Sequence, residues 1–467
     1  MNRAEAHARI NEVEARRSLF EHTIDGWSVW PIFRKTVADR LSPVFAPVIP
    51  ALRRKNPLWP LALRDAAGIL RLRPSAVLIK TYSSGLLDKT ESGKLRDIWF
   101  DDVVEAHGHA IKIEGINNAD FIPLRAKALV PSVMTTAPAD VWISRVAGRL
   151  NRSREVQKAA AELTALIAEE FDCNLSLREV RAVLANFSWQ RRYYSRVLGR
   201  VKPRVVLTAD FGEYALIAAA KPRGIPVLEL QHGITDRYHA AYAWSDSASP
   251  YRQRLPVADR MLVFGDYWRN ELSHTAFWSG AIDTVGSTRL DRHRIVARTS
   301  GKGTLRLLLT VDGFESAETI RLVRELLTAT GDTKVEVVIK LHPVYAAFDV
   351  EFRNAFAAEP RVSVRSASDG DSTFALLRAV DLHASIASAS HYDALGLGTP
   401  TAILRIQGWK TVAHLAQAGH ATLVSTGAEL FDALKWARTS PFPSEVGDLY
   451  FRRGAVNNVI SLLRRYG

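Results

Sequence analysis

The sequence predicts an α/β protein with two domains, each a parallel sheet covered by helices on both faces, and a helical N-terminal extension. The chain has 467 residues, which is too long for one hydrophobic core. From about residue 203 onward, short apolar runs alternate with segments of helical period, which indicates βαβ units. The series stops at the polar "RTSGKG" and begins again at Thr304. We therefore expect an N-terminal domain over 1–295, a C-terminal domain over 296–445 and a last helix, 446–467, that crosses back to the first domain.

The elements of the N-terminal domain follow from local patterns. Apolar residues at helical spacing between Ile10 and Val37 predict two helices, separated by Asp25-Gly26. Strands are predicted at 75–80, 108–116, 203–210, 225–233, 261–265 and within 282–291, with a long helical block over 153–201 and a shorter helix that Gly224 ends.

The C-terminal domain alternates more regularly. Strands are predicted from Thr304 and at 334–343, 361–366, 382–387 and 400–404, with helices at 317–328, 372–380 and 391–398. Each domain is therefore expected to be Rossmann-like.

Composition limits the class of protein. A hydrophobic fraction of 47% and a charged fraction of 24% are typical of a soluble globular chain. The charged N-terminus has no apolar core of the kind a secretory signal needs, and no stretch is apolar enough to cross a bilayer. The single cysteine, Cys173, excludes a disulfide framework. These features predict a cytoplasmic protein.

The net charge of +13 suits nucleic acid, an anionic membrane surface or phosphorylated substrates. The basic residues are dispersed and carry no nucleic-acid-binding motif, so no nucleic-acid partner is expected. The stretch Leu41–Arg73 mixes prolines, Trp59, leucines and arginines. It is either a solvated loop and helix or a segment that rests on anionic lipid headgroups.

Two predicted strands end abruptly in a histidine. They are the strands before Gln231-His232-Gly233 and before Lys340-Leu341-His342-Pro343. Ligands bind at the carboxyl ends of strands in open α/β sheets, so the pair predicts an interdomain cleft that holds an anion. Proline holds His342 in an extended conformation, and Lys340 shares a strand face with it. The alternative for His342 is a strand-end cap.

Hydroxyls precede the helix that begins near His391. In "SIASASHYDALGLGTP", Ser388 and Ser390 are expected to bind phosphate with the helix N-terminus, and Asp393 to accept from a ribose diol. The alternative is that these serine and aspartate side chains only cap the N-terminus of the helix.

Two aspartates end strands. Asp210 is expected to act as general base or nucleophile together with His232 in the cleft, or to cap the next helix. Asp312 with Gly313 ends the first strand of the second domain and is a cleft candidate, or a turn that starts a helix.

The polar segments contain candidates for an acceptor site but not for a metal site. The loop 81–102 suits acceptor binding through Lys89, Arg96 and Asp97, or is simply solvated. No metal is expected: Glu271 and His274 form an isolated pair, and Asp369-Gly370-Asp371 is better explained by turn and capping.

Five segments in order carry a family resemblance. "IPVLELQHG", "MLVFGDYW", "TVGSTRLD", "VVIKLHP" and "SIASASHYDALGLGTP" resemble bacterial capsule and surface-polysaccharide glycosyltransferases of the GT-B fold. Their relatives include capsular Kdo transferases, sialyl- and polysialyltransferases, and CDP-glycerol glycerophosphotransferases of teichoic-acid synthesis. The resemblance covers about residues 200–405, with a looser match at Gly26–Arg34.

The resemblance implies metal-independent transfer from a nucleotide-activated donor that is CMP-, CDP- or UDP-linked. It places His342, Ser388 and Ser390 on the donor phosphate. The group usually has Glu where this chain has Asp393. The acidic pair before glycine that sialyltransferases carry in the first domain is here only Val311-Asp312-Gly313, in the second domain. A simple sialyltransferase is therefore disfavoured, and the catalytic base stays open.

We therefore expect a cytoplasmic glycosyltransferase, peripheral on the inner membrane, that extends a capsule or lipopolysaccharide glycan or a lipid-linked glycan. A CDP-polyol phosphotransferase would attack phosphorus instead of the anomeric carbon, and a nucleotide-sugar epimerase would need no acceptor. A protein of another class, without catalysis, would use the positive charge to bind glycan or nucleic acid.

Overall fold

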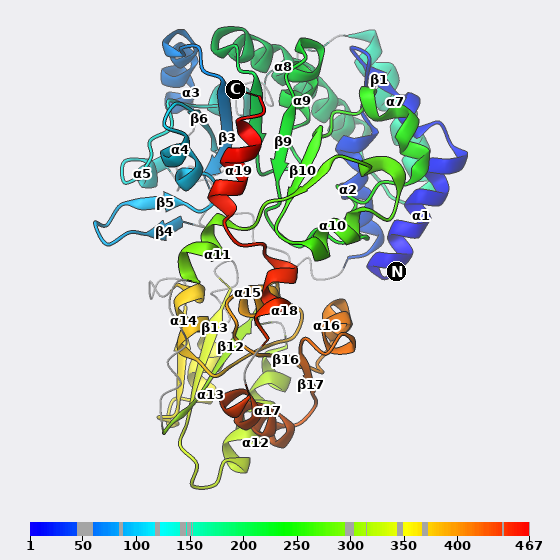
Figure 1. The fold of residues 1–467 in the computed structure, drawn as a ribbon. Coiled ribbons are helices and arrows are strands. Elements are labelled where there is room, and N and C mark those ends of the chain that lie inside the picture. Colours follow the sequence, from blue (N-terminus) through cyan, green and yellow to red (C-terminus); the bar gives the residue numbers. More distant parts are fainter. Residues whose placement is uncertain are drawn as a thin grey trace. The chain divides into compact units, whose positions relative to one another are not determined.

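The computed structural model divides the chain into two compact units (Figure 1). Unit 1 comprises Met1–Thr288 with Gly454–Gly467, and unit 2 comprises Arg289–Arg453. The structure describes residues 1–43, 59–83, 87–116, 122–140, 146, 151, 153–294, 303–313, 315–342, 349–366, 372–440 and 443–466.

Unit 1 is built on a seven-stranded sheet in the order β11-β10-β9-β8-β3-β6-β7, in which every neighbouring pair is parallel. The strands are β3 (Val77–Ser83), β6 (Ile111–Ile116), β7 (Met134–Thr135), β8 (Val205–Thr208), β9 (Val227–Leu230), β10 (Arg260–Val263) and β11 (Ile282–Thr284). All residues of β8 and β9 are buried, which explains why these strands are mostly apolar in the sequence, with Thr208 and Glu229 as the exceptions.

The direction of strand addition reverses between β3 and β8. The chain adds β6 and β7 on one side of β3, and β8 to β11 on the other. Ligands bind outside the carboxyl ends of the strands at such a switch point. A site in unit 1 is therefore expected where β3 and β8 end.

Helices cover this sheet, and two hairpins lie beside it (Figure 1). The α-helices are α1 (Arg3–Arg16), α2 (Trp30–Leu41), α3 (Trp59–Ala66), α4 (Asp101–His107), α5 (Ile122–Arg125), α7 (Arg154–Phe171), α8 (Leu177–Val201), α9 (Tyr214–Ala220), α10 (Asp266–Leu272) and α19 (Ala455–Leu463). The 3-10 helices are η1 (Leu19–Glu21), η2 (Ala67–Arg71), η5 (Lys221–Arg223), η6 (Asp246–Arg254) and η7 (Ala276–Trp278). The hairpins are β1 (Thr23–Ile24) with β2 (Trp27–Ser28), and β4 (Leu87–Lys89) with β5 (Leu95–Asp97). The C-terminal helix α19 packs on α4 and adds Val459 and Ile460 to the core around β8 and β9.

The predicted helical N-terminal region is confirmed as α1 and α2. Asp25 and Gly26 separate them with φ of 52° and 81°, in the turn of the β1–β2 hairpin. A fully buried ion pair joins the two helices, with Arg34 Nε donating to Glu14 Oε1 at 2.6 Å. Arg34 also donates to the carbonyl of Ala240, which ties the extension to the segment after β9.

The helical block predicted over 153–201 is helical, but it is divided into two helices, α7 and α8, by a break that was not predicted. Asp172 adopts a left-handed conformation after α7. Ser176 then starts α8 with a capping box in which its hydroxyl oxygen accepts from the Glu179 N–H. Continuous helical periodicity across the break concealed it.

Unit 2 is built on a six-stranded parallel sheet in the order β14-β13-β12-β15-β16-β17. The strands are β12 (Leu305–Val311), β13 (Val335–Leu341), β14 (Val362–Arg365), β15 (Leu382–Ser385), β16 (Thr401–Leu404) and β17 (Thr422–Val424). Strand addition reverses between β12 and β15, so the switch point of this sheet lies where those two strands end.

The helices of unit 2 are α11 (Thr288–His293), which begins at the boundary, α12 (Ser316–Ala329), α13 (Asp349–Ala355), α14 (Thr373–Ala379), α15 (Ser390–Gly396), η10 (Trp409–Val412), α16 (Ala413–Gln417), α17 (Gly427–Thr439) and α18 (Ser444–Tyr450). Helices α12, α14 and α15 lie where the sequence predicted helices, α11 and α13 were not predicted, and beyond residue 404 the sequence predicted only the last helix. The two Rossmann-like domains predicted from the sequence are confirmed. Within the described residues, no helix has both the length and the apolar character that crossing a membrane requires.

Candidate functional site

A buried ion pair lies at the switch point of unit 1. Lys80, on β3, places its Nζ 2.7 Å from Oε1 of Glu213, the residue before α9. Tyr82 donates its hydroxyl proton to the same oxygen at 2.5 Å, and Lys80 Nζ lies 4.0 Å from the centre of the Tyr82 ring. Both charged side chains are almost fully buried. Burial of charge is unfavourable, so a pair at this point of the sheet indicates a site.

The neighbouring strand β6 leaves room for this pair. Gly115 lies opposite Tyr82 in the parallel register. A Cβ atom at Gly115 would be 2.7 Å from Lys80 Nζ and 2.9 Å from the Tyr82 ring. A glycine at this position is therefore what lets Lys80 and Tyr82 point together toward Glu213.

Asp210, a predicted catalytic residue, lies just beyond β8, half-buried beside the same pair. Its Oδ1 accepts from the Gly212 N–H at 2.6 Å. Burial raises the pKa of the Asp210 carboxyl to about 6; the Gly212 N–H opposes this rise, the charge of Glu213 adds to it and Lys80 reduces it. A carboxyl that titrates close to neutral pH is suited to proton transfer.

A second carboxyl, Asp140, approaches the ion pair after β7. Burial raises its pKa to about 6, while the Lys80 charge lowers it and the Glu213 charge raises it. Thr136 donates its hydroxyl proton to Asp140 Oδ2 at 2.9 Å. Two carboxyls that titrate near pH 6 thus share the Lys80–Glu213 environment.

His232, the other predicted catalytic residue, follows β9 and lies among aromatic rings. Phe211 stacks against it with ring centroids 6.3 Å apart, and Trp99 meets it edge-on. His232 Nδ1 and the Tyr242 hydroxyl share a hydrogen bond of 3.4 Å, and Tyr242 donates to buried Glu229. Burial lowers the pKa of His232 to about 4 and raises that of Glu229 to about 8. The imidazole is therefore neutral at physiological pH and, with so low a pKa, a weaker base than Asp210.

The cleft candidates Gln231 and Gly233 are joined to each other. Gln231 is fully buried, its Oε1 accepts from the Phe264 N–H at 2.8 Å, and its Nε2 donates to the Gly233 carbonyl at 2.8 Å. The amide of Gln231 thus fastens the end of β9 to the end of β10. A Cβ atom at Gly233 would meet no atom within 4 Å.

Hydroxyls gather at the switch point of unit 2. Ser385, which ends β15, donates to the Thr310 carbonyl on β12 at 2.6 Å. The hydroxyls of Ser390 and Thr310 are 2.7 Å apart, and both contact Nε2 of His383, at 3.1 and 2.9 Å. Ser390 also donates to the hydroxyl oxygen of half-buried Ser388 at 2.8 Å. The predicted phosphate-binding serines are thus joined to a buried network.

Two buried histidines complete this network. Nδ1 of His383 and Nδ1 of His391 lie 2.8 and 2.7 Å from the one hydroxyl of Thr401. Burial lowers the pKa of His391 to about 3 and that of His383 well below its ordinary value, so both rings are neutral. Since Thr401 has one proton, one imidazole accepts from it and the other donates to it. The network fixes Ser390 without placing a charge in the core.

His342 and Asp312 end neighbouring strands in unit 2. The exposed His342 donates its backbone N–H to the Val311 carbonyl at 3.0 Å. Desolvation raises the pKa of the Asp312 carboxyl, and the His342 charge opposes the rise. Gly313 has a φ of 95°, which explains a glycine in the turn after β12. Pro343 lies outside the described residues.

Lys340 and Asp393, the other predicted donor residues, differ in their surroundings. Lys340 is buried, and its Nζ donates to the Ser366 carbonyl at 2.8 Å, which holds the end of β14. Asp393 is half-buried on α15. Burial raises its pKa to about 6, and the Arg289 charge opposes this. Donor contacts by either residue stay predictions.

The acceptor candidates lie around the β4–β5 hairpin. Lys89 is exposed, and Arg96 forms ion pairs with Asp102 and with Glu105. Asp97 is buried and accepts from the Thr81 hydroxyl at 2.7 Å. It lines a cavity of about 30 Å³, which has room for little more than water. Acceptor binding by these three residues stays a prediction.

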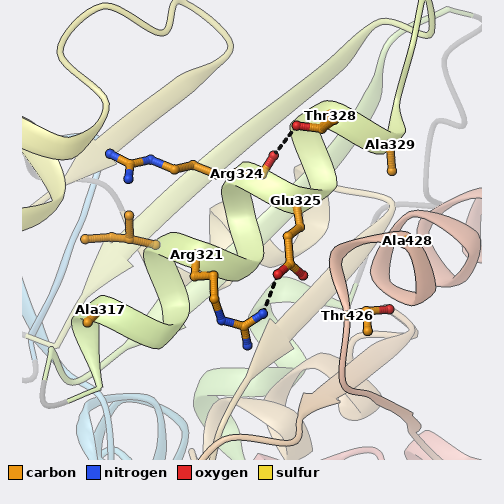
Figure 2. A pocket seen from close by; sticks show the side chains of 9 residues that line it. Ala317, Arg321, Arg324, Glu325, Thr328, Ala329, Thr426 and Ala428 are labelled. Carbon is orange, nitrogen blue, oxygen red and sulfur yellow. Dashed lines mark hydrogen bonds and ion pairs between the residues drawn. The ribbon is translucent and has the colours of Figure 1, made fainter.

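A larger, open groove of about 570 Å³ lies on the outer side of α12, beside the start of α17 (Figure 2). Arg321 and Glu325 line it and form an i, i+4 ion pair, and Glu325 also accepts from the Gly427 N–H at 3.1 Å. The groove runs along helices and contains no predicted site residue. Its polar groups pair with one another, so it gives no sign of a ligand.

Within the residues that the structure describes, no group of three or more His, Cys, Asp or Glu is arranged to hold a metal ion. Glu271 instead pairs with Arg237, with 2.5 Å between Arg237 Nη2 and Glu271 Oε1. The segment Asp369-Gly370-Asp371 lies outside the described residues.

Sequence reasoning missed four residues at the two switch points: Lys80, Asp140, Thr310 and His383. A signal existed for Lys80 and His383, because a lysine or histidine within a short, buried strand is unusual. Asp140 had none, since its proximity to Lys80 depends on strand order.

Solved structures share this architecture. The UDP-GlcNAc 2-epimerase of Neisseria meningitidis is 14% identical with a TM-score of 0.53, over 83% of this chain and 99% of that one. The enzyme of the same name from Methanocaldococcus jannaschii is 12% identical with a TM-score of 0.53, over 84% and 99%. The wall teichoic acid polymerase TagF is 12% identical with a TM-score of 0.45, over 85% and 90%.

The sequence itself has no match among protein-family models or among curated proteins. At these identities the structural likeness establishes architecture only. Together with the two parallel sheets, it shows that the chain has the GT-B fold of two Rossmann-like domains.

Proposed function

We propose that this protein transfers a sugar from a nucleotide-activated donor to a capsule or lipopolysaccharide glycan on the cytoplasmic side of the membrane. The observation that carries the proposal is Asp210, a half-buried carboxyl at the switch point of unit 1 whose pKa is raised to about 6. Sugar transfer requires a base for the acceptor hydroxyl, and such a carboxyl is ionised at neutral pH yet basic enough to take the proton. The family resemblance adds the nature of donor and acceptor.

In the proposed reaction, the acceptor oxygen attacks the anomeric carbon while its proton moves to Asp210. The bond between that carbon and the donor phosphate oxygen breaks, and the electron pair leaves with the nucleotide. Burial raises the pKa of Asp210 to about 6, and the nearby charges of Glu213 and Lys80 act on it in opposite directions. His232, neutral and within an aromatic wall, is the alternative base.

Unit 2 would hold the donor. His342 and Ser388 present polar groups at the strand ends next to the switch point, where a departing phosphate needs hydrogen-bond donors. Ser390 would act through Ser388, which it contacts at 2.8 Å, and Asp393 would accept from the ribose. A CMP-, CDP- or UDP-linked donor fits this role.

A second candidate, nucleotide-sugar epimerisation, is favoured by Asp140. An epimerase needs one group to remove a proton from carbon and another to return it, and Asp140 and Asp210 both titrate near pH 6 around one ion pair. Epimerisation would proceed without an acceptor.

The test is turnover of nucleotide sugars with and without glycan acceptors. We expect acceptor-dependent release of one nucleotide, and at least about 100-fold slower transfer by Asp210→Asn, the typical contribution of a general base. Glu318→Gln, at an exposed carboxylate on α12, should retain full activity. Full transfer by Asp210→Asn would refute the proposed base. Interconversion without acceptor would identify an epimerase, and transfer of a polyol phosphate would identify the phosphotransferase.

A further inference from the structure

Helix α3 and the 3-10 helix η2 that continues it have an apolar face that packs on the edge of the unit 1 sheet. Leu61 and Ala62 enter a small core with Ile116. Asp65, also buried, accepts from the Thr135 N–H on β7 at 3.2 Å. These contacts fix which side of the segment faces the protein.

The opposite side of the same segment is also apolar, and it is exposed. Trp59, Leu63 and Leu70 are 53%, 53% and 71% exposed. They are spaced by four and seven residues, which places them along one side of a helix. Isolated exposed leucines are ordinary, but a line of large apolar side chains headed by tryptophan marks an interaction surface.

Arginines surround this line. Arg64, Arg71 and Arg73 are exposed in the same segment. Arg200, at the end of α8, donates to the Leu70 carbonyl at 2.9 Å and so brings a second basic stretch alongside. That stretch adds exposed Lys202 and Arg204. Over 59–73 and 196–204 the one acidic residue is Asp65, which is buried.

We propose that this α3–η2 surface, made of Trp59, Leu63 and Leu70 with the six surrounding basic residues, docks the protein on an anionic lipid membrane. The apolar line would enter the headgroup boundary while the guanidinium groups pair with lipid phosphates. A second copy of this chain is disfavoured as the occupant, because a two-fold contact would face arginines with arginines. Nucleic acid has no apolar layer to receive Trp59 and the two leucines.

The membrane surface is independent of the reaction proposed above, and vesicle binding tests it without any activity measurement. The full chain is sedimented with vesicles of phosphatidylcholine alone or mixed with phosphatidylglycerol. We expect binding to the anionic vesicles that weakens as salt rises, and little binding to the neutral ones. Leu63→Glu should weaken it, because it replaces an apolar side chain of the surface by an anion that the lipid phosphates repel. The double variant Arg71→Gln/Arg73→Gln should weaken it by about five-fold for each arginine removed.

Leu177→Glu is the matched control, because Leu177 is 50% exposed on the far end of α8. It should bind vesicles as the unchanged protein does. The proposal fails if anionic vesicles are not bound, or if Leu63→Glu binds them as tightly as Leu177→Glu. Loss of a dimer in Leu63→Glu without vesicle binding would assign the surface to a second copy and equally overturn it. Unchanged melting temperatures confirm that the variants are folded.

Discussion

At the scale of residues, carboxyls with raised pKa values gather where unit 1 is expected to act. Burial raises the pKa values of Asp210, Asp140 and Glu229 into the range of about 6 to 8. The charge of Lys80 lowers the pKa values of the first two and so limits the rise. A buried carboxyl with a raised pKa lowers the stability of the folded protein at neutral pH, because ionisation is less favourable in the folded state than in the unfolded chain. Sites that perturb several carboxyls together are typical of catalytic machinery.

Glu229 gives the clearest stability test. Its pKa is about 8 in the folded protein against 4.5 ordinarily, so the unfolded chain releases this proton first as pH rises. The contribution of Glu229 to stability therefore falls between about pH 4.5 and 8. Glu229→Gln, which keeps an acceptor for Tyr242, should match the unchanged protein in acid and exceed it by a few kcal/mol at pH 8. Urea unfolding across this range measures the difference.

The exposed Glu318→Gln serves as the control and should show no such trend with pH. An unfolding free energy of Glu229→Gln that stays parallel to that of the unchanged protein from pH 4.5 to 8 would contradict the raised pKa.

At the scale of elements, the strands were predictable where they are buried on both faces. Runs such as "VVLT" in β8 and "LLLTV" in β12 are apolar except for one threonine each, because helices cover both sides. The two-residue β7 and the elements β17, α16 and α17 were missed because their patterns are short or mixed. The break at Asp172 was missed because helical periodicity continues across it.

The location of the predicted site residues within each sheet could also not be predicted from local sequence patterns. The histidine-ended strands β9 and β13 are each one place away from a switch point, next to β8 and β12. The sequence shows that a strand ends in a polar residue, but strand order arises from tertiary packing. Lys80 and Glu213, about 130 residues apart in the chain, could therefore not be paired in advance.

Gly115 tests the fit between β3 and β6. An alanine there would place its Cβ against Lys80 Nζ and the Tyr82 ring, and would push both away from Glu213. We expect Gly115→Ala to lose about 1–3 kcal/mol of unfolding free energy, as overpacked cores do. Gly199→Ala is the control, since its Cβ would meet no atom within 4 Å on α8. If the two variants unfold at the same denaturant concentration, the close packing of Lys80 and Tyr82 against Gly115 does not contribute to stability as proposed.

At the scale of the whole molecule, the two units divide the polar chemistry. Unit 1 carries carboxylates and a lysine at its switch point, and unit 2 carries mainly hydroxyls and neutral imidazoles at its own, with the carboxyl of Asp312 at the end of β12. Carboxylates suit proton transfer, whereas hydroxyls and imidazoles suit binding of a phosphate without repelling it. This division is what the proposed transfer from a nucleotide-linked donor requires.

The most direct test is nucleotide binding, measured by thermal shift with CMP, CDP, UDP, GDP and dTDP. We predict that one nucleotide raises the melting temperature selectively and in proportion to the logarithm of its concentration. Ser388→Ala should reduce the shift, and Thr328→Ala, an exposed hydroxyl on α12, should not. CMP would indicate an ulosonic-acid donor, CDP a polyol phosphate and UDP a hexose. No stabilisation by any of the five nucleotides, or an undiminished shift in Ser388→Ala, would contradict the proposed donor site.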